Sequence, residues 1–445
     1  MSKPLSEMPR VDVRPFDAAY WTGGLASAMA AAAMEHGPVY RWEATDPYES
    51  GETRVSMIGP EANRFVMHTH RHAFSHDLGW SPFISDMFGK GLLNMDDPEH
   101  AVHRKMWNPA FAGAVMGAYL PVMQRVIQQR TATWLDSGEV DLYGEARTIT
   151  FDVAAAALAG FEPGPEVDRM RRLFQGLLLG PSGDQEQESF LASFMSMRDE
   201  LVGRLLAMIS ARRAAPPDER PRDVLGLIVH ARDDRGRPLS DEQVLAHLSI
   251  LLIAGHETTT TLASWALYTL ATMPEHSARL LEEIEAAPRD ENGALTFEAL
   301  RSLKTLDNFV RETGRIWPPV LNVPRGVTED VEFGGYLIPA GTQVRLGLAA
   351  THRLPTVFKD PDRFDPDRFA PPRDEDKATP YALVTFGGGP RVCIGLHFAH
   401  IEVKALIAHV LPRYTLTYTG GTPPVHAGFL NAFIPHGMPV RVAAR

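Results

Sequence analysis

The stretch from Ser240 to Pro274 constrains the fold more than any other part of the sequence. Ser240-Asp241-Glu242-Gln243 has the form of a helix capping box, and Pro274 ends the helical pattern. At about 1.5 Å per residue, a helix of this length spans roughly 50 Å. It must therefore cross the interior of a large domain, and it presents an apolar face made of Val244, Leu245, Leu248, Leu251 and Leu252.

The centre of this predicted helix is polar. It reads Ala254-Gly255-His256-Glu257-Thr258-Thr259-Thr260-Thr261. Glycine and threonine are poor helix formers, since threonine hydroxyls compete for backbone carbonyl groups. We expect the segment to loosen or kink the helix. It is either a tolerated irregularity or a polar notch that faces a buried site.

Cys393 is the only cysteine, so no disulfide can form within the chain. Most single cysteines are small buried hydrophobes. This one follows Phe386-Gly387-Gly388-Gly389-Pro390-Arg391-Val392, which predicts a tight loop, and it precedes a predicted helix. The free N–H groups at a helix N-terminus stabilise a thiolate. Such a thiolate is either a nucleophile or a metal ligand, and the loop alone does not decide between them.

Composition excludes several classes of protein. The 445 residues are 44% hydrophobic and 22% charged, which is typical of a folded chain with a large core. Lys plus Arg number 44 and Asp plus Glu number 55, and the net charge of -11 argues against nucleic acid or an anionic membrane as the main partner. No apolar run is long enough for a membrane span, and the alanine-rich run at 26–33 lacks the basic leader of a signal peptide. We expect a cytoplasmic protein.

Strand patterns occur towards both ends of the sequence, with mostly helical patterns between Pro60 and Pro318. We expect strands from both ends of the chain to form one small sheet. Val331–Ile338 and Gln343–Leu348 flank Pro339-Ala340-Gly341, which predicts a hairpin. We predict a single domain over residues 1–445, mainly α with a small β-sheet region (α+β). The other predicted elements are a helix at Ala26–Glu35 and strands at Val39–Ala44, Thr53–Ile58, Tyr414–Tyr418 and Met438–Val442.

A third pattern is Glu312-Thr313-Gly314-Arg315. Its glutamate and arginine, at i and i+3, share one helix face and can pair. Arg368 lies downstream in a rigid turn that contains Pro366. Taken alone, such a pair is an ordinary ion pair on the surface of a helix.

Together these segments resemble the haem-thiolate monooxygenases, the cytochromes P-450. Residues 386–395 match the family's F-G-x-G-x-[RH]-x-C-x-G at every fixed position, and residues 254–258 match A-G-x-[DE]-T. Glu312 and Arg315 match E-x-x-R, which Arg368 completes. Residues 96–104 resemble D-P-P-E-H-x-x-x-R, with Asp97 replacing the first proline. The resemblance covers essentially the whole chain. The length of the chain suits a soluble bacterial member of the family.

The resemblance implies a role for each matching residue. Haem b (iron protoporphyrin IX) is expected between the long central helix and the cysteine-loop helix, with Cys393 as the iron ligand. Phe386 is expected to pack against the sulfur, and the N–H groups of residues 394–396, Gly395 included, to donate to it. Thr258 and Glu257 become the catalytic pair, and Glu312, Arg315 and Arg368 a structural triad. The haem propionates are expected to bind His100, Arg104, Arg325 and Arg391.

The resemblance implies that one atom of O₂ is inserted into a C–H or C=C bond of a hydrophobic small molecule, which is thereby hydroxylated or epoxidised. We expect the enzyme to be a monomer. Electrons are expected from a separate ferredoxin or flavodoxin, because one cysteine cannot hold an iron–sulfur cluster. Two alternatives stay open, a peroxide-dependent or isomerising haem-thiolate enzyme and a non-catalytic haem sensor or carrier. Neither needs the Glu257–Thr258 pair.

Two expected surfaces follow from the resemblance. The substrate pocket is expected to draw on residues 74–91, 173–194, 251–258, 319–323 and 429–433, which include Trp80, Phe83, Phe88, Phe429 and Phe433. A local basic patch for the electron donor is expected from Arg71, Arg104, Lys105, Arg391 and Lys404.

Several histidines need separate consideration. His68, His70, His72 and His76 include i, i+4 pairs that could bind zinc on one helix face, but no cysteine or obvious carboxylate accompanies them, so we expect solvated helix-end side chains. Two positions depart from the family pattern: His400 replaces an arginine, and His352-Arg353-Leu354 replaces N-R-D.

Overall fold

The structure is a computed structural model that describes residues 2–12, 14–43, 52–179, 187–216, 223–233 and 235–445. The chain divides into two compact units. The first, which we call the sheet unit, comprises Met1–Gly79, Thr131–Ala146 and Thr258–Arg445. The second, the helical unit, comprises Trp80–Arg130 and Arg147–Glu257. The prediction of one domain over residues 1–445 stays a prediction.

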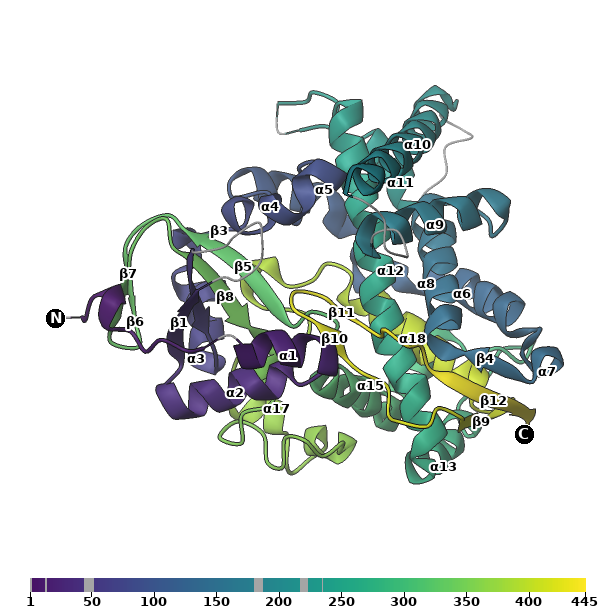
Figure 1. The fold of residues 1–445 in the computed structure, drawn as a ribbon. Coiled ribbons are helices and arrows are strands. Elements are labelled where there is room, and N and C mark those ends of the chain that lie inside the picture. Colours follow the sequence, from purple (N-terminus) through teal and green to yellow (C-terminus); the bar gives the residue numbers. More distant parts are fainter. Residues whose placement is uncertain (1, 13, 44–51, 180–186, 217–222, 234) are drawn as a thin grey trace. The chain divides into compact units, whose positions relative to one another are not determined.

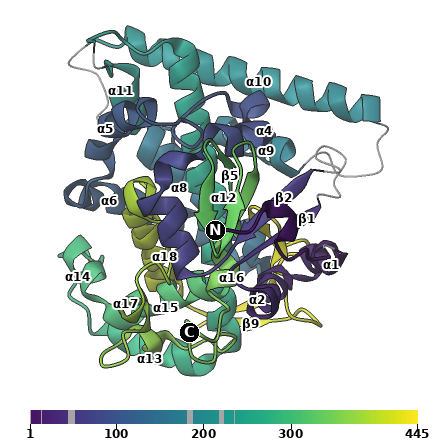
Figure 2. The ribbon, with the colours of Figure 1, turned by 90° about the vertical axis from the view of Figure 1, so that its left-hand side faces the viewer.

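The main sheet of the sheet unit combines strands from distant parts of the chain. Its order is β1-β2-β8-β5-β3, and only the β2–β8 pair is parallel. In Figure 2 β1 and β2 lie on one side of β5, with α1 and α2 nearby, and β8 pairs with both β2 and β5. The predicted pairing of N-terminal with later strands is therefore confirmed. The strands are β1 (Val39–Glu43), β2 (Thr53–Met57), β3 (Phe74–Ser75), β5 (Asn322–Val327) and β8 (Gln343–Gly347).

The predicted hairpin around Pro339-Ala340-Gly341 is wrong. Strands β6 (Val331–Phe333) and β7 (Tyr336–Ile338) pair with each other instead, and β8 pairs with β2 and β5. The physical reason is Gly334-Gly335, whose φ values of 59° and 86° allow a tight turn that other residues rarely adopt. The predicted strand Val331–Ile338 is thus split in two.

Two smaller sheets complete the strand content of the described residues in the sheet unit. One has the order β4-β12-β9 and the other consists of β10 and β11. Their bounds are β4 (Glu139–Asp141), β9 (Tyr414–Tyr418), β10 (Ala427–Gly428), β11 (Ala432–Phe433) and β12 (Pro439–Ala444).

Helices make up most of the chain, as the predicted mainly α fold class requires (Figure 1). Helix α2 packs on α1, α16 and β1, and together they bury one apolar core of the sheet unit. The helices that lie wholly in this unit are α1 (Arg14–Thr22), α2 (Leu25–His36), α3 (Pro60–Arg64), α7 (Trp134–Ser137), α13 (Pro274–Glu285), α14 (Phe297–Ser302), α15 (Lys304–Ile316), α16 (Leu348–Thr351), α17 (Glu375–Ala378) and α18 (Leu396–Val410), with short turns η1 (Leu5–Glu7), η2 (Phe65–Thr69), η3 (Arg71–Ala73), η5 (Pro366–Phe369) and η6 (Gly389–Arg391).

The helical unit holds the remaining helices wholly or in part. Helices α4, α6, α8 and α12 contribute residues to both units. The bounds are α4 (Asp77–Phe88), α5 (Glu99–Phe111), η4 (Gly113–Val115), α6 (Met116–Thr131), α8 (Leu142–Ala159), α9 (Pro165–Leu179), α10 (Gln187–Ala214), α11 (Val224–Val229) and α12 (Asp241–Thr272).

Helix α12 is the long helix that the sequence predicts. The backbone N–H of Gln243 donates to Ser240 Oγ at 3.3 Å, and the N–H of Ser240 donates to Gln243 Oε1 at 3.0 Å, so the capping box is confirmed. The helix ends at Thr272, just before Pro274 begins α13. The polar centre does not interrupt it, and helical structure continues through residues 254–261.

Two further expectations concern histidines and membranes. His68, His72 and His76 do not share a helix face, because they lie in η2, in η3 and beyond β3, and no cluster of metal-ligating side chains occurs within the described residues. Among those residues no single helix combines the length and the hydropathy that a membrane crossing needs. One pair bent by 67°, Glu99–Phe111 with Met116–Ser137, passes that test only when taken together.

Candidate active site

Cys393 lies between η6 and the first turn of α18, as predicted. Its backbone N–H donates to the carbonyl of Phe386 at 2.9 Å, which closes the loop on itself. The thiol is exposed and forms no disulfide. Gly395 caps α18, and a Cβ atom at that position would lie 3.9 Å from the sulfur. The thiol therefore stands just before the N-terminus of a 15-residue helix.

Glycine is required at two positions of the loop. Gly387 and Gly389 have φ values of 72° and 63°, a region that other residues rarely adopt. A side chain on Gly389 would collide with the carbonyl oxygen of Met67, where η6 packs on η2. The loop is therefore held against the rest of the sheet unit by close backbone contact.

Glu312, Arg315 and Arg368 form a fully buried cluster behind this loop. Glu312 accepts from Arg315 at 2.8 and 2.9 Å and from Arg368 at 3.0 Å, and all three side chains are 0% exposed. Arg315 also donates to the carbonyls of His352 and Pro361, and Arg368 to that of Lys359. Because arginine lacks acceptors and presents several donors, it can hold several backbone segments at once.

His352 connects this cluster to the cysteine loop. Its Nε2 accepts from the backbone N–H of Val384 at 3.0 Å, and its carbonyl accepts from Arg315. Burial lowers the pKa of His352 to about 3, so the ring stays neutral and can accept. The hydroxyl of Thr385, next to Phe386, donates to the carbonyl of Gly314 at 3.1 Å. The loop is thus tied to His352, next to α16, at Val384 and to α15 at Thr385.

The polar centre of α12 is only partly buried. Ala254 is exposed and Thr258 half-buried, although residues 259–267 are buried. In the helical unit the Glu257 carboxylate, 20% exposed, lies 3.4 Å from Arg147 Nε, and Arg147 Nη2 donates to its other oxygen at 3.5 Å. His256 packs edge-on against Phe151 at 5.1 Å, and burial lowers its pKa to about 4.

The cationic residues predicted for the propionates occupy both units. In the sheet unit Arg325 is buried on β5, where its Nη1 donates to the carbonyl of Pro324 at 2.6 Å, and Arg391 is half-buried in η6. In the helical unit His100 and Arg104 lie one turn apart on α5, with His100 buried and 3.3 Å from Asp97.

A family model described as "Cytochrome P450" matches residues 170–434. Cytochrome P450 136 of Mycobacterium tuberculosis is 31% identical over 370 residues, which cover 81% of this chain and 74% of that protein. The chain belongs to the cytochrome P450 family. Haem, O₂ and an electron donor are therefore required, and the P450 is an oxidoreductase of the monooxygenase class.

Other comparisons agree with this membership. A sterol 14α-demethylase of Mycolicibacterium vanbaalenii is 29% identical and covers 81% of each chain. A retinoic-acid-bound cyanobacterial CYP120A1 superposes with a TM-score of 0.84 at 26% identity over 100% of both chains. The predicted P450 fold is therefore confirmed.

The residues of this P450 fit a haem group. An exposed thiol stands at a helix N-terminus beside glycines that leave room for close approach, and thiolate is an established haem ligand. Buried and half-buried arginines in the same unit supply the cations that propionates need. Phe386 lies 5.1 Å from the ring of His400, and its predicted packing on the sulfur stays a prediction.

One member of the predicted basic patch is misplaced. Lys404 is buried on α18, with Nζ 3.4 Å from the carbonyl of Leu303 and 3.5 Å from Asp307, so it is unavailable to a docking protein. Its long aliphatic stem and internal acceptors explain how a lysine can lie there. Arg71 and Lys105 are exposed.

Arg147 is a site residue that the sequence reasoning missed. It is the only basic residue of α8, in the segment Ala146-Arg147-Thr148-Ile149-Thr150-Phe151. A buried arginine requires a nearby carboxylate. That requirement was the available signal, but its partner Glu257 is 110 positions away in sequence, and only the fold brings them together.

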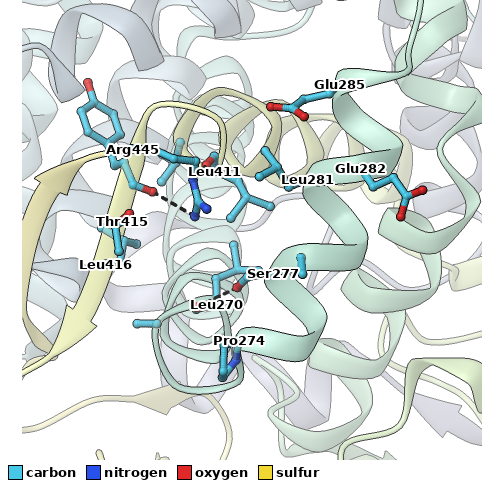
Figure 3. Close-up of a pocket in the computed structure, with 14 residues that line it drawn as sticks. Leu270, Pro274, Ser277, Leu281, Glu282, Glu285, Leu411, Thr415, Leu416 and Arg445 are labelled. Atoms are coloured by element: carbon cyan, nitrogen blue, oxygen red, sulfur yellow. Dashed lines mark hydrogen bonds between the residues drawn. The ribbon is translucent and has the colours of Figure 1, made fainter.

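A separate pocket of about 490 Å³ lies in the sheet unit (Figure 3). It is lined by Leu270 of α12, by Pro274 and Leu281 of α13 and by Leu411 just beyond α18. Leu411 follows the end of α18 opposite to Cys393, and a helix of this length spans roughly 20 Å. This pocket is therefore distinct from the cysteine site.

Proposed function

We propose that Cys393 holds the iron of haem b and that this P450 hydroxylates or epoxidises a hydrophobic small molecule. The observation that carries the proposal is the exposed Cys393 thiol at the N-terminus of α18, in a loop fixed by backbone contacts. Bound haem supplies the activation and transfer of oxygen. The protein supplies the ligand, the counter-charges, a dry apolar pocket and protons.

The cofactor-binding residues are those that the family motifs mark. Gly395 leaves room beside the sulfur. Phe386, whose ring lies 5.1 Å from that of His400 on α18, is proposed to pack against the sulfur. His100 and Arg104 from α5, with Arg325 and Arg391 from the sheet unit, neutralise the propionates. Each of these groups carries a donor suited to a carboxylate.

Thr258 and Glu257 are proposed to deliver protons to the site of oxygen activation. Neighbouring residues of a helix differ in direction by about 100°, so both cannot face the same point. Thr258 Oγ1 is assigned to the oxygen side, where its hydroxyl donates a hydrogen bond. Glu257 turns towards Arg147 and is partly exposed, which suits a carboxylate that collects protons from water.

The ligand assignment is tested by the reduced carbon monoxide complex. The parent protein should show the red-shifted Soret band of thiolate-ligated haem, and Cys393→Ser should lose it. Circular dichroism of both proteins controls for folding. Survival of the red-shifted band in folded Cys393→Ser contradicts the proposal.

A hydrophobic substrate is proposed from the side chains of the expected pocket segments. Trp80 and Phe88 are buried on α4, and Phe429 and Phe433 are half-buried near β10 and β11. Two relatives are named for apolar compounds, a sterol and retinoic acid. We extend the shared apolar character, and not either identity, to this chain. A screen of terpenoids, fatty acids and polyketides for shifts of the haem spectrum tests this class.

Electrons are proposed to come from a separate ferredoxin or flavodoxin. NADPH consumption with a surrogate reductase, measured with and without a binding compound, separates this enzyme from the two alternatives. A peroxide-dependent enzyme or isomerase turns over without NADPH, and a haem sensor or carrier forms no product. The proposal treats the protein as a cytoplasmic monomer with one catalytic domain over residues 1–445, which size-exclusion chromatography and cell fractionation test.

A further inference from the structure

A continuous row of aromatic rings runs through the sheet unit from α15 to β9. The indoles of Trp317 and Trp265 are stacked with centroids 4.5 Å apart and planes 5° from parallel. Trp265 meets Tyr268 edge-on at 5.4 Å, and Tyr268 meets Tyr418 edge-on at 5.1 Å. These four residues belong to α12, β9 and the segment after α15 (Figure 1), and none of them is part of a motif used above.

The inner end of this row lies near the cysteine loop. A Cβ atom on Gly314 would lie 2.8 Å from Thr385 and 3.6 Å from Leu262, so α15, the loop before Phe386 and α12 meet at this glycine. Trp317 follows Gly314 by about one helical turn, and Trp265 follows Leu262 by the same interval. Trp265 also follows Thr258 by about two turns of α12.

Trp265 is placed so that it keeps its proton. Its indole nitrogen is buried and has no hydrogen-bond partner within the described part of the chain. The ring of His426 lies edge-on at 5.7 Å, but burial lowers the pKa of His426 to about 3, so it is a poor proton acceptor. An indole that loses an electron without losing its proton remains a strong one-electron oxidant, able to oxidise a tyrosine in contact with it.

Tyr418 is placed so that it can lose its proton. It is half-buried, and its hydroxyl donates to the carbonyl of Thr422 at 2.7 Å in an exposed turn. The backbone at Gly420 packs directly under that hydroxyl, where a side chain would collide with it. A tyrosine releases its phenolic proton when it is oxidised, and water is available at this position to take it.

We propose that Trp317, Trp265, Tyr268 and Tyr418 form a one-electron relay that removes oxidising equivalents from the haem site when no substrate is bound. Hydrogen peroxide is the oxidant. Its O–O bond breaks, and with two electrons, one delivered in each of two passages, and two protons from water it becomes two molecules of water. In each passage the tryptophan pair gives up one electron, Tyr268 and Tyr418 replace it, and the Tyr418 O–H bond breaks with its proton going to water. An external thiol then returns one electron and one proton to Tyr418.

The relay rests on the proposed function, since it needs haem at Cys393. The test treats the substrate-free holoprotein with hydrogen peroxide, freezes it rapidly and records electron paramagnetic resonance spectra. The parent should show a tyrosyl radical that Tyr418→Phe loses. Tyr414→Phe is the matched control, because Tyr414 lies on the same strand but contacts Trp134 instead of the row. Peptide mass spectrometry should find peroxide-dependent oxidation at Tyr418.

Loss of the haem Soret band during peroxide exposure is the second measurement. It should be faster in Trp265→Phe and Tyr418→Phe than in the parent and in Tyr414→Phe. Tyr418→Phe keeps the test decisive if the buried Trp265→Phe fails to fold. Absence of the thiolate Soret band before peroxide is added would count against the proposed function. If the Soret band is normal before peroxide is added, two results would contradict the relay and leave the proposed function standing. These are equal bleaching rates in parent and variants, or a tyrosyl radical that is unchanged in Tyr418→Phe.

Discussion

Two glutamates that the family motifs mark, Glu312 of the sheet unit and Glu257 of the helical unit, are held in opposite ways. Glu312 is 0% exposed and accepts four hydrogen bonds at 2.8 to 3.0 Å, from Arg315, Arg368 and the N–H of Asp365. Glu257 is 20% exposed, and its contacts with Arg147 and His256 are 3.4 to 3.5 Å long. The first carboxylate is saturated with short hydrogen bonds, whereas these contacts of the second are long.

The difference follows from what each carboxylate must do. Hydrogen bonds near 2.9 Å fix the orientation of both partners, whereas contacts near 3.5 Å are weak and easily exchanged. Glu312 supports a loop whose thiol must stay in one place. Under the proposed function Glu257 exchanges protons, and a carboxylate saturated with short hydrogen bonds could not do so without breaking them. The predictions below test this contrast.

The largest expected effect is the loss of the Glu312 charge. Glu312→Gln leaves Arg315 and Arg368 without their buried anion, and breaking a buried ion pair costs about 3–5 kcal/mol of unfolding free energy. We expect a large drop in urea-unfolding stability and poor haem retention. The matched control is Arg279→Gln, which breaks the neighbouring Arg279–Asp367 pair whose side chains are 50% and 51% exposed. It should cost at most about 1 kcal/mol.

Equal stability losses in these two variants would contradict the role given to burial of the Glu312 cluster. A small loss in both would mean that the buried cluster is replaceable, and a large loss in both would mean that exposure does not distinguish the two carboxylates. Urea titrations at a single pH and salt concentration provide the comparison.

The next largest effect concerns catalysis. Glu257→Gln should slow oxygen activation by about a hundredfold, the lower end of what a positioned proton donor contributes, with a larger solvent isotope effect. Thr258→Ala should keep NADPH oxidation but release peroxide in place of product. Thr259→Ala, at the adjacent buried position, is the control and should leave the ratio of product to NADPH unchanged. An unchanged ratio in Thr258→Ala would exclude that hydroxyl as the hydrogen-bond donor.

The cysteine loop and the Glu312 cluster, which we call the fixed region, could largely be predicted from local sequence. The loop of Gly387 and Gly389, the helix after Cys393 and the pairing of Glu312 with Arg315 all depend on residues a few positions apart. The capping box of α12 is equally local. Backbone conformation and short-range pairing are the features that residue type controls most directly.

The surroundings of Glu257, which we call the loose region, and the pairing of the strands could not be predicted in this way. Arg147 meets Glu257 only because α8 packs on α12, and Lys404 is buried because α18 packs next to Leu303. The sequence around Gly334 fits one long strand or two short ones, and the partner of β8 decides between them. These outcomes depend on contacts between residues far apart in the chain.

A smaller effect is expected from His352, which supports the fixed region. Its pKa is lowered to about 3 in the folded protein, against about 6.5 when unfolded. Between these values the unfolded chain binds the extra proton, so stability falls as pH decreases from about 6.5 to 3, by roughly 1.4 kcal/mol per pH unit. His352→Gln keeps an acceptor for the N–H of Val384 but cannot titrate. Its unfolding free energy should depend less steeply on pH by that amount, and parallel curves would contradict the neutral-acceptor role.

The smallest expected effect tests whether electron delivery depends on an exposed charge outside both regions. Lys105 is exposed on α5, whereas Lys404 is buried and therefore excluded. Charges are screened beyond about 8–10 Å at physiological salt, and one exposed ion pair contributes at most about 1 kcal/mol. Lys105→Glu should therefore slow reduction by an acidic ferredoxin by no more than about fivefold, mostly at low salt. Lys105→Gln removes one unit of charge instead of reversing it, and its effect should be about half as large in free energy. Stopped-flow reduction across a salt series measures both. Rates that are equal for parent and both variants at every salt concentration would remove Lys105 from the docking surface and leave Arg71 as the exposed candidate.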